Sequence, residues 1–97
     1  MDVIAIEALE FGPAVGRLMA EQGYSYRQLA QRTGLSGGYL NHLVHGNRPA
    51  PPNDVIERIA AALEIDPAAF RDYRMRVVWE ALVERPDLVD TLYREFS

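Results

Sequence analysis

Three arginines and two histidines lie in a stretch of this sequence that contains no acidic residue. Neither Asp nor Glu occurs between positions 22 and 53, although the 97-residue chain has a formal net charge of −4. The basic side chains in that stretch are Arg27, Arg32, His42, His45 and Arg48. Because guanidinium groups bind phosphate oxygens through paired N–H donors, this segregation of charge predicts one face suited to a polyanion. The plain alternative is an uneven scatter of charge arising by chance in a small domain.

The other residues that could carry chemistry do not form a catalytic set. Ser25 and Ser36 stand directly before short helical patterns, where serine is a typical N-cap, and no Ser-His-Asp arrangement is suggested by their spacing. His42 and His45 are three positions apart on one expected helix, but no acid or cysteine lies nearby to complete a metal site. The sequence also lacks a phosphate-binding loop and a cofactor fingerprint. We therefore expect neither an enzyme nor a metal or cofactor site.

Length and composition favour one small domain. The chain is 48% hydrophobic, enough for a core that self-association would help to stabilise. It has no run of about eighteen apolar residues that would span a membrane, and its acidic N-terminus lacks the basic start of a signal peptide. No cysteine is present, so no disulfide framework is expected. These features indicate a cytoplasmic protein that does not enter a membrane.

Helical patterns cover most of the chain and predict an all-α fold, because alternating β-branched runs are absent. A first helix is expected to begin near Gly12-Pro13, since proline is favoured in a first turn, and to end at Gly23. Residues 1–10, including Val3-Ile4, are compatible with a short strand, an arm or the start of a helix.

Two short helices joined by a tight turn are predicted over residues 25–45. Ser25 and Gln28 have the spacing of a capping box, in which each side chain bonds the backbone N–H of the other residue. Gly34 is expected at positive φ in the turn, and Ser36 is expected to cap the second helix.

Three more helices are predicted after a proline-rich loop. Asn53 is expected to cap a fourth helix, and Asp66 followed by Pro67 predicts the start of a fifth that runs to about residue 84. Pro86 separates this helix from the last one.

An ordered set of short motifs accompanies these helices, namely Leu29-Ala30, Gly34-Leu35-Ser36, Leu40 with Leu43, Gly46-Asn47-Arg48-Pro49, Ile59-Ala60-Ala61-Ala62-Leu63 and Asp66-Pro67 with Phe70. In this set the chain resembles the Cro/C1-type (XRE-like) helix-turn-helix domain of phage repressors and bacterial regulators. The resemblance covers residues 11–70. It implies a lambda-repressor-like bundle of five helices, in which the helix at about residues 36–45 enters the major groove of double-stranded DNA.

The resemblance also assigns contacts, position by position. Expected base contacts come from Gly37, Gly38, Tyr39, Asn41 and His42. Expected contacts to the DNA backbone come from Arg17, Ser25, Tyr26, Arg27, Ser36 and Arg48. Residues 1–10 would form an N-terminal arm.

The chain departs from the family pattern at Gly37 and Gly38, where typical members carry polar or basic side chains. Glycine offers no side chain to a base edge, so direct readout would rest on few residues. The glycines would permit close approach of the backbone to DNA, and part of the specificity would then come from DNA shape.

Residues 71–97 lie beyond the resemblance and form a C-terminal helical extension with apolar side chains on more than one face. We expect a homodimer interface, or a dock for another protein, formed by Met75, Val78, Trp79, Leu82, Leu88, Leu92, Tyr93 and Phe96. The alternative is an intramolecular lid that enlarges the core.

The sequence therefore predicts a sequence-specific, DNA-binding transcriptional regulator that forms a homodimer. A rival hypothesis uses the same helix-turn-helix fold as a protein-interaction module, such as an antitoxin-like protein or an accessory subunit. The acidic net charge favours the rival, as do the two glycines at the start of the helix at about residues 36–45. The stretch without acidic residues and the arginine-bearing loop around Arg48 favour DNA.

Overall fold

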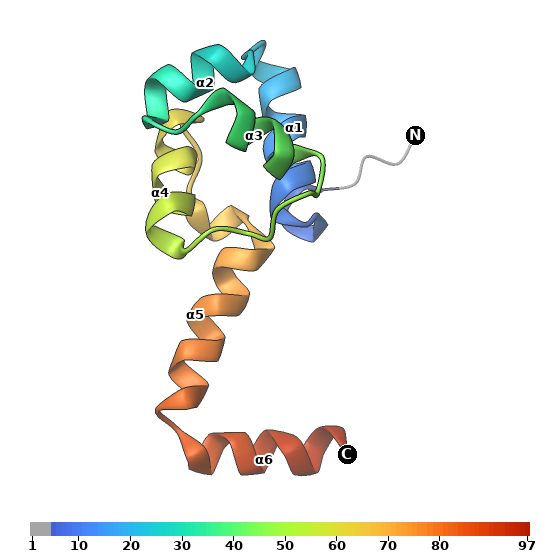
Figure 1. The fold of residues 1–97 in the computed structure, drawn as a ribbon. Coiled ribbons are helices and arrows are strands. Elements are labelled where there is room, and N and C mark those ends of the chain that lie inside the picture. The colour runs from blue at the N-terminus through green and yellow to red at the C-terminus, as the bar shows by residue number, and fades with distance from the viewer. Residues whose placement is uncertain (1–4) are drawn as a thin grey trace.

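The computed structural model describes residues 5–97, and these residues form helices and no strand (Figure 1). The elements in chain order are the 3-10 turn η1 (Ile6–Ala8), α1 (Phe11–Gln22), α2 (Tyr26–Thr33), α3 (Gly37–Val44), α4 (Asn53–Ala62), the 3-10 turn η2 (Pro67–Ala69), α5 (Arg71–Val83) and α6 (Pro86–Phe96). The all-α class predicted from the sequence is confirmed. Of the alternatives left open for residues 1–10, the part at Val3-Ile4 lies outside the described residues.

The body of the protein is a bundle in which α1, α2, α3, α4 and η2 enclose one core. Its largest fully buried side chains are Phe11, Val15, Leu29, Leu40, Leu43, Ile56, Ile59, Leu63 and Phe70. Phe11 and Phe70 pack edge to face with ring centroids 4.8 Å apart, an arrangement favoured by the ring quadrupoles. The core therefore joins the first helix to the segment that precedes α5.

Local sequence signals define the ends of α2 as predicted. The Gln28 N–H donates to Ser25 Oγ at 3.1 Å, and the Ser25 N–H donates to Gln28 Oε1 at 2.8 Å, which completes the capping box. Gly34 ends α2 in the left-handed conformation at φ 76°, which glycine adopts without the steric cost of a Cβ. Ser36 then caps α3 through a 3.0 Å bond from the Tyr39 N–H.

Two predicted helix starts were wrong. The N-cap of α4 is Pro52, whose extended backbone leads directly into Asn53 as the first helical residue. The Asn53 side-chain oxygen is thereby left for a contact with α5. Asp66 caps as predicted through the Ala68 N–H at 2.9 Å, but the turn it starts is a 3-10 turn of three residues.

The long helix α5 begins only at Arg71, because Phe70 has an extended backbone at φ −87° and ψ 126°. That conformation interrupts the helix where the Phe70 ring enters the core. The predicted helix from Pro67 is thus divided in two by the burial of one aromatic side chain.

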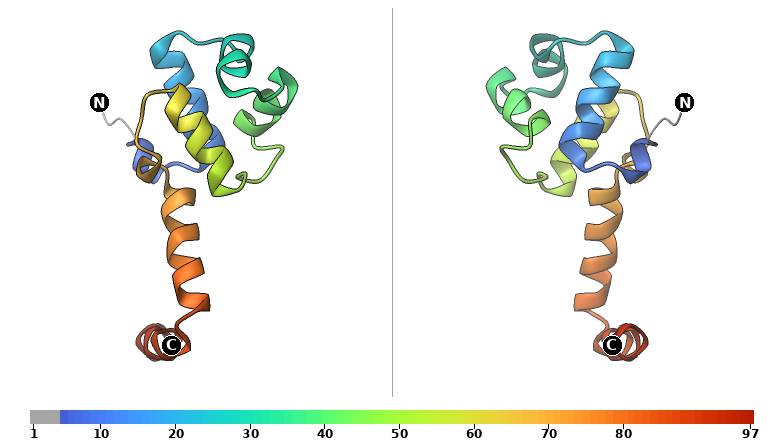
Figure 2. Two further views of the ribbon diagram at one scale, coloured as in Figure 1. Left: turned by 90° about the vertical axis from the view of Figure 1, so that its left-hand side faces the viewer. Right: turned by 90° about the vertical axis from the view of Figure 1, so that its right-hand side faces the viewer.

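The last two helices project from the bundle as an arm. In Figures 1 and 2, α5 leaves the bundle end-on and α6 crosses its far end. The Cα radius of gyration is 15.5 Å, whereas a compact chain of this length has a value of about 13 Å. No helix within residues 5–97 combines the length and the apolar character needed to cross a membrane.

The base of the arm is tied to the N-terminal end of the bundle. The Phe11 N–H donates to Asp72 Oδ2 at 2.7 Å, so a carboxylate on α5 caps α1. Arg74 donates to the carbonyl of Glu7 at 2.8 Å and to that of Ala68 at 2.8 Å. These bonds connect α5 to η1, α1 and η2 at once, so the arm leaves the bundle in a defined direction.

Candidate nucleic-acid interface

The turn between α2 and α3 is held by one buried hydroxyl. Thr33 Oγ1 donates to the carbonyl of Leu29 at 2.8 Å and accepts the Leu35 N–H at 3.2 Å. Thr33 is the buried polar residue of the core, with 4% of its surface exposed. One side chain thus satisfies a donor and an acceptor on either side of Gly34 and connects the two helices across the turn.

Helix α1 supports α3 from behind through two glycines one turn apart. A Cβ at Gly12 would lie 2.0 Å from the carbonyl oxygen of Leu43, and a Cβ at Gly16 would lie 2.7 Å from Val44 Cγ1. The α3 backbone approaches α1 closely because Gly12 lacks a side chain, and the Val44 side chain fills the space that a Cβ at Gly16 would take. Sequence reasoning missed this contact, although the i, i+4 spacing of the two glycines was a visible signal.

The opposite face of α3 is open to solvent. Gly38, Asn41 and His42 are exposed, whereas Gly37 and Tyr39 are half-buried. Tyr39 also packs against the core. Helix α3 lies at the outer edge of the bundle in both views of Figure 2. The five residues predicted to contact bases therefore share the first two turns of α3, and three of them are freely accessible.

Neither glycine at the start of α3 is required by the structure of the chain itself. A Cβ at Gly38 would meet nothing within 4 Å, and one at Gly37 would be in ordinary contact with Tyr26 at 3.9 Å. Both have negative φ, since positive values in the described residues occur at other positions. Packing and backbone geometry would thus accept alanine at both sites.

Two of the predicted backbone-contact arginines are available to a ligand. The side chains of Arg27 on α2 and Arg48 in the loop after α3 are exposed, and neither forms an ion pair or hydrogen bond within the described residues. Arg17 differs, because its Nε lies 3.4 Å from Glu21 Oε1. Tyr26, which was also predicted to contact the DNA backbone, is half-buried against the core.

The two remaining predicted backbone contacts, Ser25 and Ser36, are exposed at the N-termini of α2 and α3. Their hydroxyls serve as caps, as described above. The backbone N–H groups of each first turn point outward along the helix axis, where helix N-termini commonly hold phosphate oxygens.

Other basic residues of the acid-free stretch have intramolecular contacts. The Arg32 guanidinium carbon lies 4.7 Å from the centroid of the Tyr24 ring, a cation–π contact. His45 Nδ1 donates to the Asn41 carbonyl at 2.8 Å, so the histidine closes the end of α3. No group of three or more histidine or acidic side chains within residues 5–97 could hold a metal ion.

The arm carries the predicted interface residues on its surface. Met75, Val78, Trp79, Tyr93 and Phe96 are exposed, and Leu82, Leu88 and Leu92 are half-buried. Val77, Val83 and Val89 are exposed as well, and the interface expected from the sequence did not include them. Every large hydrophobic residue that is exposed in the described part of the chain belongs to α5 or α6.

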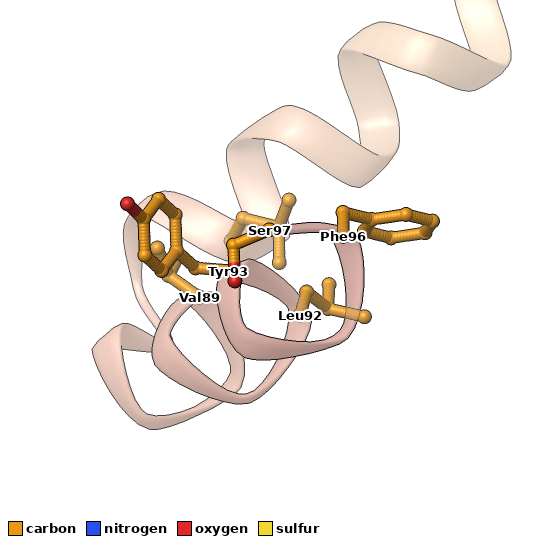
Figure 3. Close-up of a pocket in the computed structure, with 6 residues that line it drawn as sticks. Val89, Leu92, Tyr93, Phe96 and Ser97 are labelled. Atoms are coloured by element: carbon orange, nitrogen blue, oxygen red, sulfur yellow. The ribbon is translucent and has the colours of Figure 1, made fainter.

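The inner corner of the arm forms a hollow of about 280 Å³ (Figure 3). It is lined by Leu82, Val89, Leu92, Tyr93, Phe96 and Ser97. Because neither α5 nor α6 contains a buried residue, the arm does not act as a lid on the core. The alternative of an intramolecular lid was therefore wrong.

Two short helices at a fixed angle, with the second supported from behind and open on its outer face, define a helix-turn-helix domain. Residues 10–72 match the family model described as helix-turn-helix domain, and the chain belongs to that family. The resemblance stated from the sequence is confirmed, and membership supports a DNA-binding regulator in general terms.

A solved structure has the same fold. The chain is similar to one in the structure titled SinR protein/SinI protein complex, with 24% identity, a TM-score of 0.58 and coverage of 88% of each chain. This likeness concerns the fold alone, and its coverage is too large to be confined to the helix-turn-helix domain. No curated protein matches the chain.

Proposed function

We propose that this protein is a sequence-specific transcriptional regulator that inserts α3 into the major groove of DNA. The observation that carries the proposal is the open outer face of α3, flanked by the unpaired Arg27 and Arg48 in a stretch without acidic residues. A helix of this kind fits the major groove, and exposed arginines in the segments before and after it suit phosphate oxygens.

Base reading rests on a small number of side chains. Asn41 can form paired hydrogen bonds with adenine, and His42 beside it can donate to or accept from a base edge. Tyr39 is half-buried and packs on the core, so only the exposed part of its side chain is available to the groove. Gly37 and Gly38 add no side chain and instead allow the backbone of α3 to come close to the DNA.

Contacts to the DNA backbone come from both helix starts and from the arginines. Arg27 and Arg48 are exposed and bind phosphates directly. The first turns after Ser25 and Ser36 offer backbone N–H groups, and Tyr26 stands beside them. Arg17 exchanges its ion pair with Glu21 for a phosphate.

The arm supplies association with a second copy of the chain. One α3 reads only a short half-site, and a two-fold dimer places two of them on one DNA face, about 34 Å or a multiple apart. The exposed apolar residues of α5 and α6 include Trp79, Tyr93 and Phe96, and aromatic residues of this kind are enriched in the centres of protein interfaces. A two-fold interface lets each copy cover the same patch of the other.

A second candidate function is a protein-interaction module, such as an antitoxin-like protein or an accessory subunit. The observations in its favour are the net charge of −4 and the two glycines, Gly37 and Gly38, at the first two positions of α3. The similar solved structure is titled as a complex of two differently named proteins, which supports a different protein as the occupant of the arm.

The deciding experiment is selection of binding sites from a random duplex library with the purified protein. We expect an enriched inverted repeat. The variants Arg27→Ala and Arg48→Ala should each weaken binding, whereas Arg94→Ala on α6 removes the same charge from the far end of the arm and should not. Sedimentation of each variant checks that its oligomeric state is unchanged.

Salt dependence separates the two functions. The logarithm of the DNA-binding constant should fall with the logarithm of salt concentration by about 0.9 per phosphate contacted, and each arginine variant should reduce that slope by about 1. A well-folded protein that enriches no sequence, or whose DNA binding does not respond to salt, would contradict the proposal. That result would favour the interaction module.

A further inference from the structure

Arg76 connects the arm to the loop that follows α3. Its Nη1 donates to the carbonyl of Pro51, by a short bond, and to Asn53 Oδ1 at 3.1 Å. Its Nη2 donates to the carbonyl of Ala50 at 3.4 Å. One guanidinium group thus bonds three acceptors around the junction between this loop and α4.

The loop has few means of ordering itself. It spans residues 45–52 and contains Pro49, Pro51 and Pro52, which have no N–H to donate. The Asn47 N–H bonds the carbonyl of His42 at 2.9 Å, which continues the end of α3. Farther along, the carbonyls of Ala50 and Pro51 receive the Arg76 bonds instead of bonds from within the loop.

A planar guanidinium suits this role better than an ammonium group would. Its N–H donors have fixed directions, so bonding two successive carbonyls also fixes the direction of the chain between them. Arg76 itself is half-buried and lies on a helix whose base is held by Asp72 and Arg74. Arg76 therefore anchors the loop to a rigid part of the molecule.

We propose that Arg76 is a positioning residue that holds the loop so that Arg48 faces the DNA backbone. This inference rests on the proposed function, because it assigns Arg48 to a phosphate. Arg48 is exposed and has no partner of its own within the described residues, so the shape of the backbone around it determines where its side chain can reach. Arg76 acts through that backbone and touches no DNA.

The first test uses the free protein. In Arg76→Gln, NMR order parameters of the Arg48 and Ala50 amides should fall from about 0.85, typical of rigid backbone, to below about 0.6, whereas the Asn47 amide, which bonds the His42 carbonyl, should stay rigid. Arg94→Gln is the matched control, because it makes the same chemical change on α6, where the exposed side chain has no hydrogen bond or ion pair within the described residues. Unchanged amides in Arg76→Gln, with the fold intact by circular dichroism, would overturn the proposal.

The second test is a double-mutant cycle on DNA binding, with a random-sequence duplex as the probe because phosphate contacts dominate non-specific binding. Arg48→Ala should weaken binding about tenfold, the typical effect of losing one hydrogen bond to a charged group. Arg76→Gln should weaken binding to a similar extent, and the double variant should bind no more weakly than Arg48→Ala alone. Arg94→Gln should bind like the wild type.

The outcomes distinguish a failure of the Arg76 inference from a failure of the proposed DNA-binding function. Independent, multiplying losses in the double variant would show that Arg76 does not act through Arg48, and would overturn the inference. A wild-type protein that does not bind the duplex at low salt would instead overturn the proposed function. In that case DNA would no longer be the reason for the ordering, and the amide measurement would still decide whether Arg76 holds the loop.

Discussion

Gly12 on α1 lies directly against the carbonyl of Leu43 on α3. A Cβ built at Gly12 would lie 2.0 Å from that oxygen and 3.1 Å from the carbonyl carbon. Both atoms belong to the backbone of the helix proposed to read DNA, so they cannot move without shifting the helix. How closely α3 packs on α1 therefore depends on the absence of a Cβ at Gly12.

Replacement of Gly12 by alanine should accordingly destabilise the protein. Alanine is the better helix former by about 0.5–1 kcal/mol, but a steric clash with backbone typically costs about 1–3 kcal/mol, and we expect the clash to dominate. Urea unfolding followed by circular dichroism measures the difference. A variant as stable as the wild type would show that α1 and α3 can separate without loss.

Gly38 provides the opposite case, because a Cβ there would meet nothing. Gly38→Ala should raise the free energy of unfolding by about 0.5–1 kcal/mol, since alanine reduces the backbone entropy of the unfolded chain. If the backbone of α3 approaches DNA closely, the same substitution should weaken binding to the selected site. Stability and affinity would then change in opposite directions, as expected where a residue serves a ligand at the expense of the fold. Affinity that stays the same or increases would count against a close approach at Gly38.

The contrast between these glycines shows how far sequence reasoning extends. Gly34 and the Ser25–Gln28 capping box were predicted correctly, because the partners of each lie within a few residues. The contact of Gly12 with Leu43 and the bond from Phe11 to Asp72 join residues far apart in the chain. Local sequence patterns do not predict which of these distant residues contact each other. Long-range packing is decided by the whole core.

The same limit explains the errors at the helix starts. Asn53 and Asp66 are both good capping residues, and Asp66 does cap. The burial of Phe70 divides the predicted fifth helix, and burial of one particular side chain is a tertiary effect that propensity does not contain. The assignment of base and phosphate contacts stays a prediction, although the exposure of Asn41 and His42 is compatible with it.

The Thr33 hydroxyl should stabilise the turn between α2 and α3. Valine has nearly the same shape as threonine but lacks the hydroxyl, so Thr33→Val leaves the Leu35 N–H without its acceptor. An unsatisfied, partly buried donor costs about 1–3 kcal/mol, and we expect a loss in that range by chemical unfolding. Thr33→Ser retains the hydroxyl and should recover part of the loss. Equal stability of the valine and serine variants would show that packing, not the hydrogen bond, is what Thr33 provides.

Tyr73 at the base of the arm should lose its proton at a higher pH than an ordinary tyrosine. Its hydroxyl donates to Glu57 Oε2 at 2.9 Å, and this bond, with partial burial and nearby carboxylates, raises the pKa of Tyr73 above 10.0. Because the protonated form is favoured in the folded state, the resulting stabilisation is complete below about pH 10 and is lost as pH rises through the folded pKa. Ring resonances assigned by comparison with Tyr73→Phe would follow the titration. Glu57→Ala removes both the acceptor and the charge and should bring the midpoint back towards 10.0, and an unchanged midpoint would exclude Glu57 as the cause.

Trp79 offers a direct measurement of association, because it is the only tryptophan in the chain and 66% of its surface is exposed. If α5 and α6 of two copies pack together, its fluorescence maximum should move to shorter wavelength as protein concentration rises, in step with dimer formation by analytical ultracentrifugation. Trp79→Ala should weaken the dimer about 30-fold, since an aromatic residue at the centre of an interface contributes about 2 kcal/mol or more. The control is Thr91→Ala, which changes an exposed polar residue of α6 whose hydroxyl bonds only within its own helix. A chain that remains monomeric at high concentration, with emission independent of dilution, would exclude the homodimer. The apolar arm would then be available to a different protein, the outcome that the interaction-module hypothesis requires.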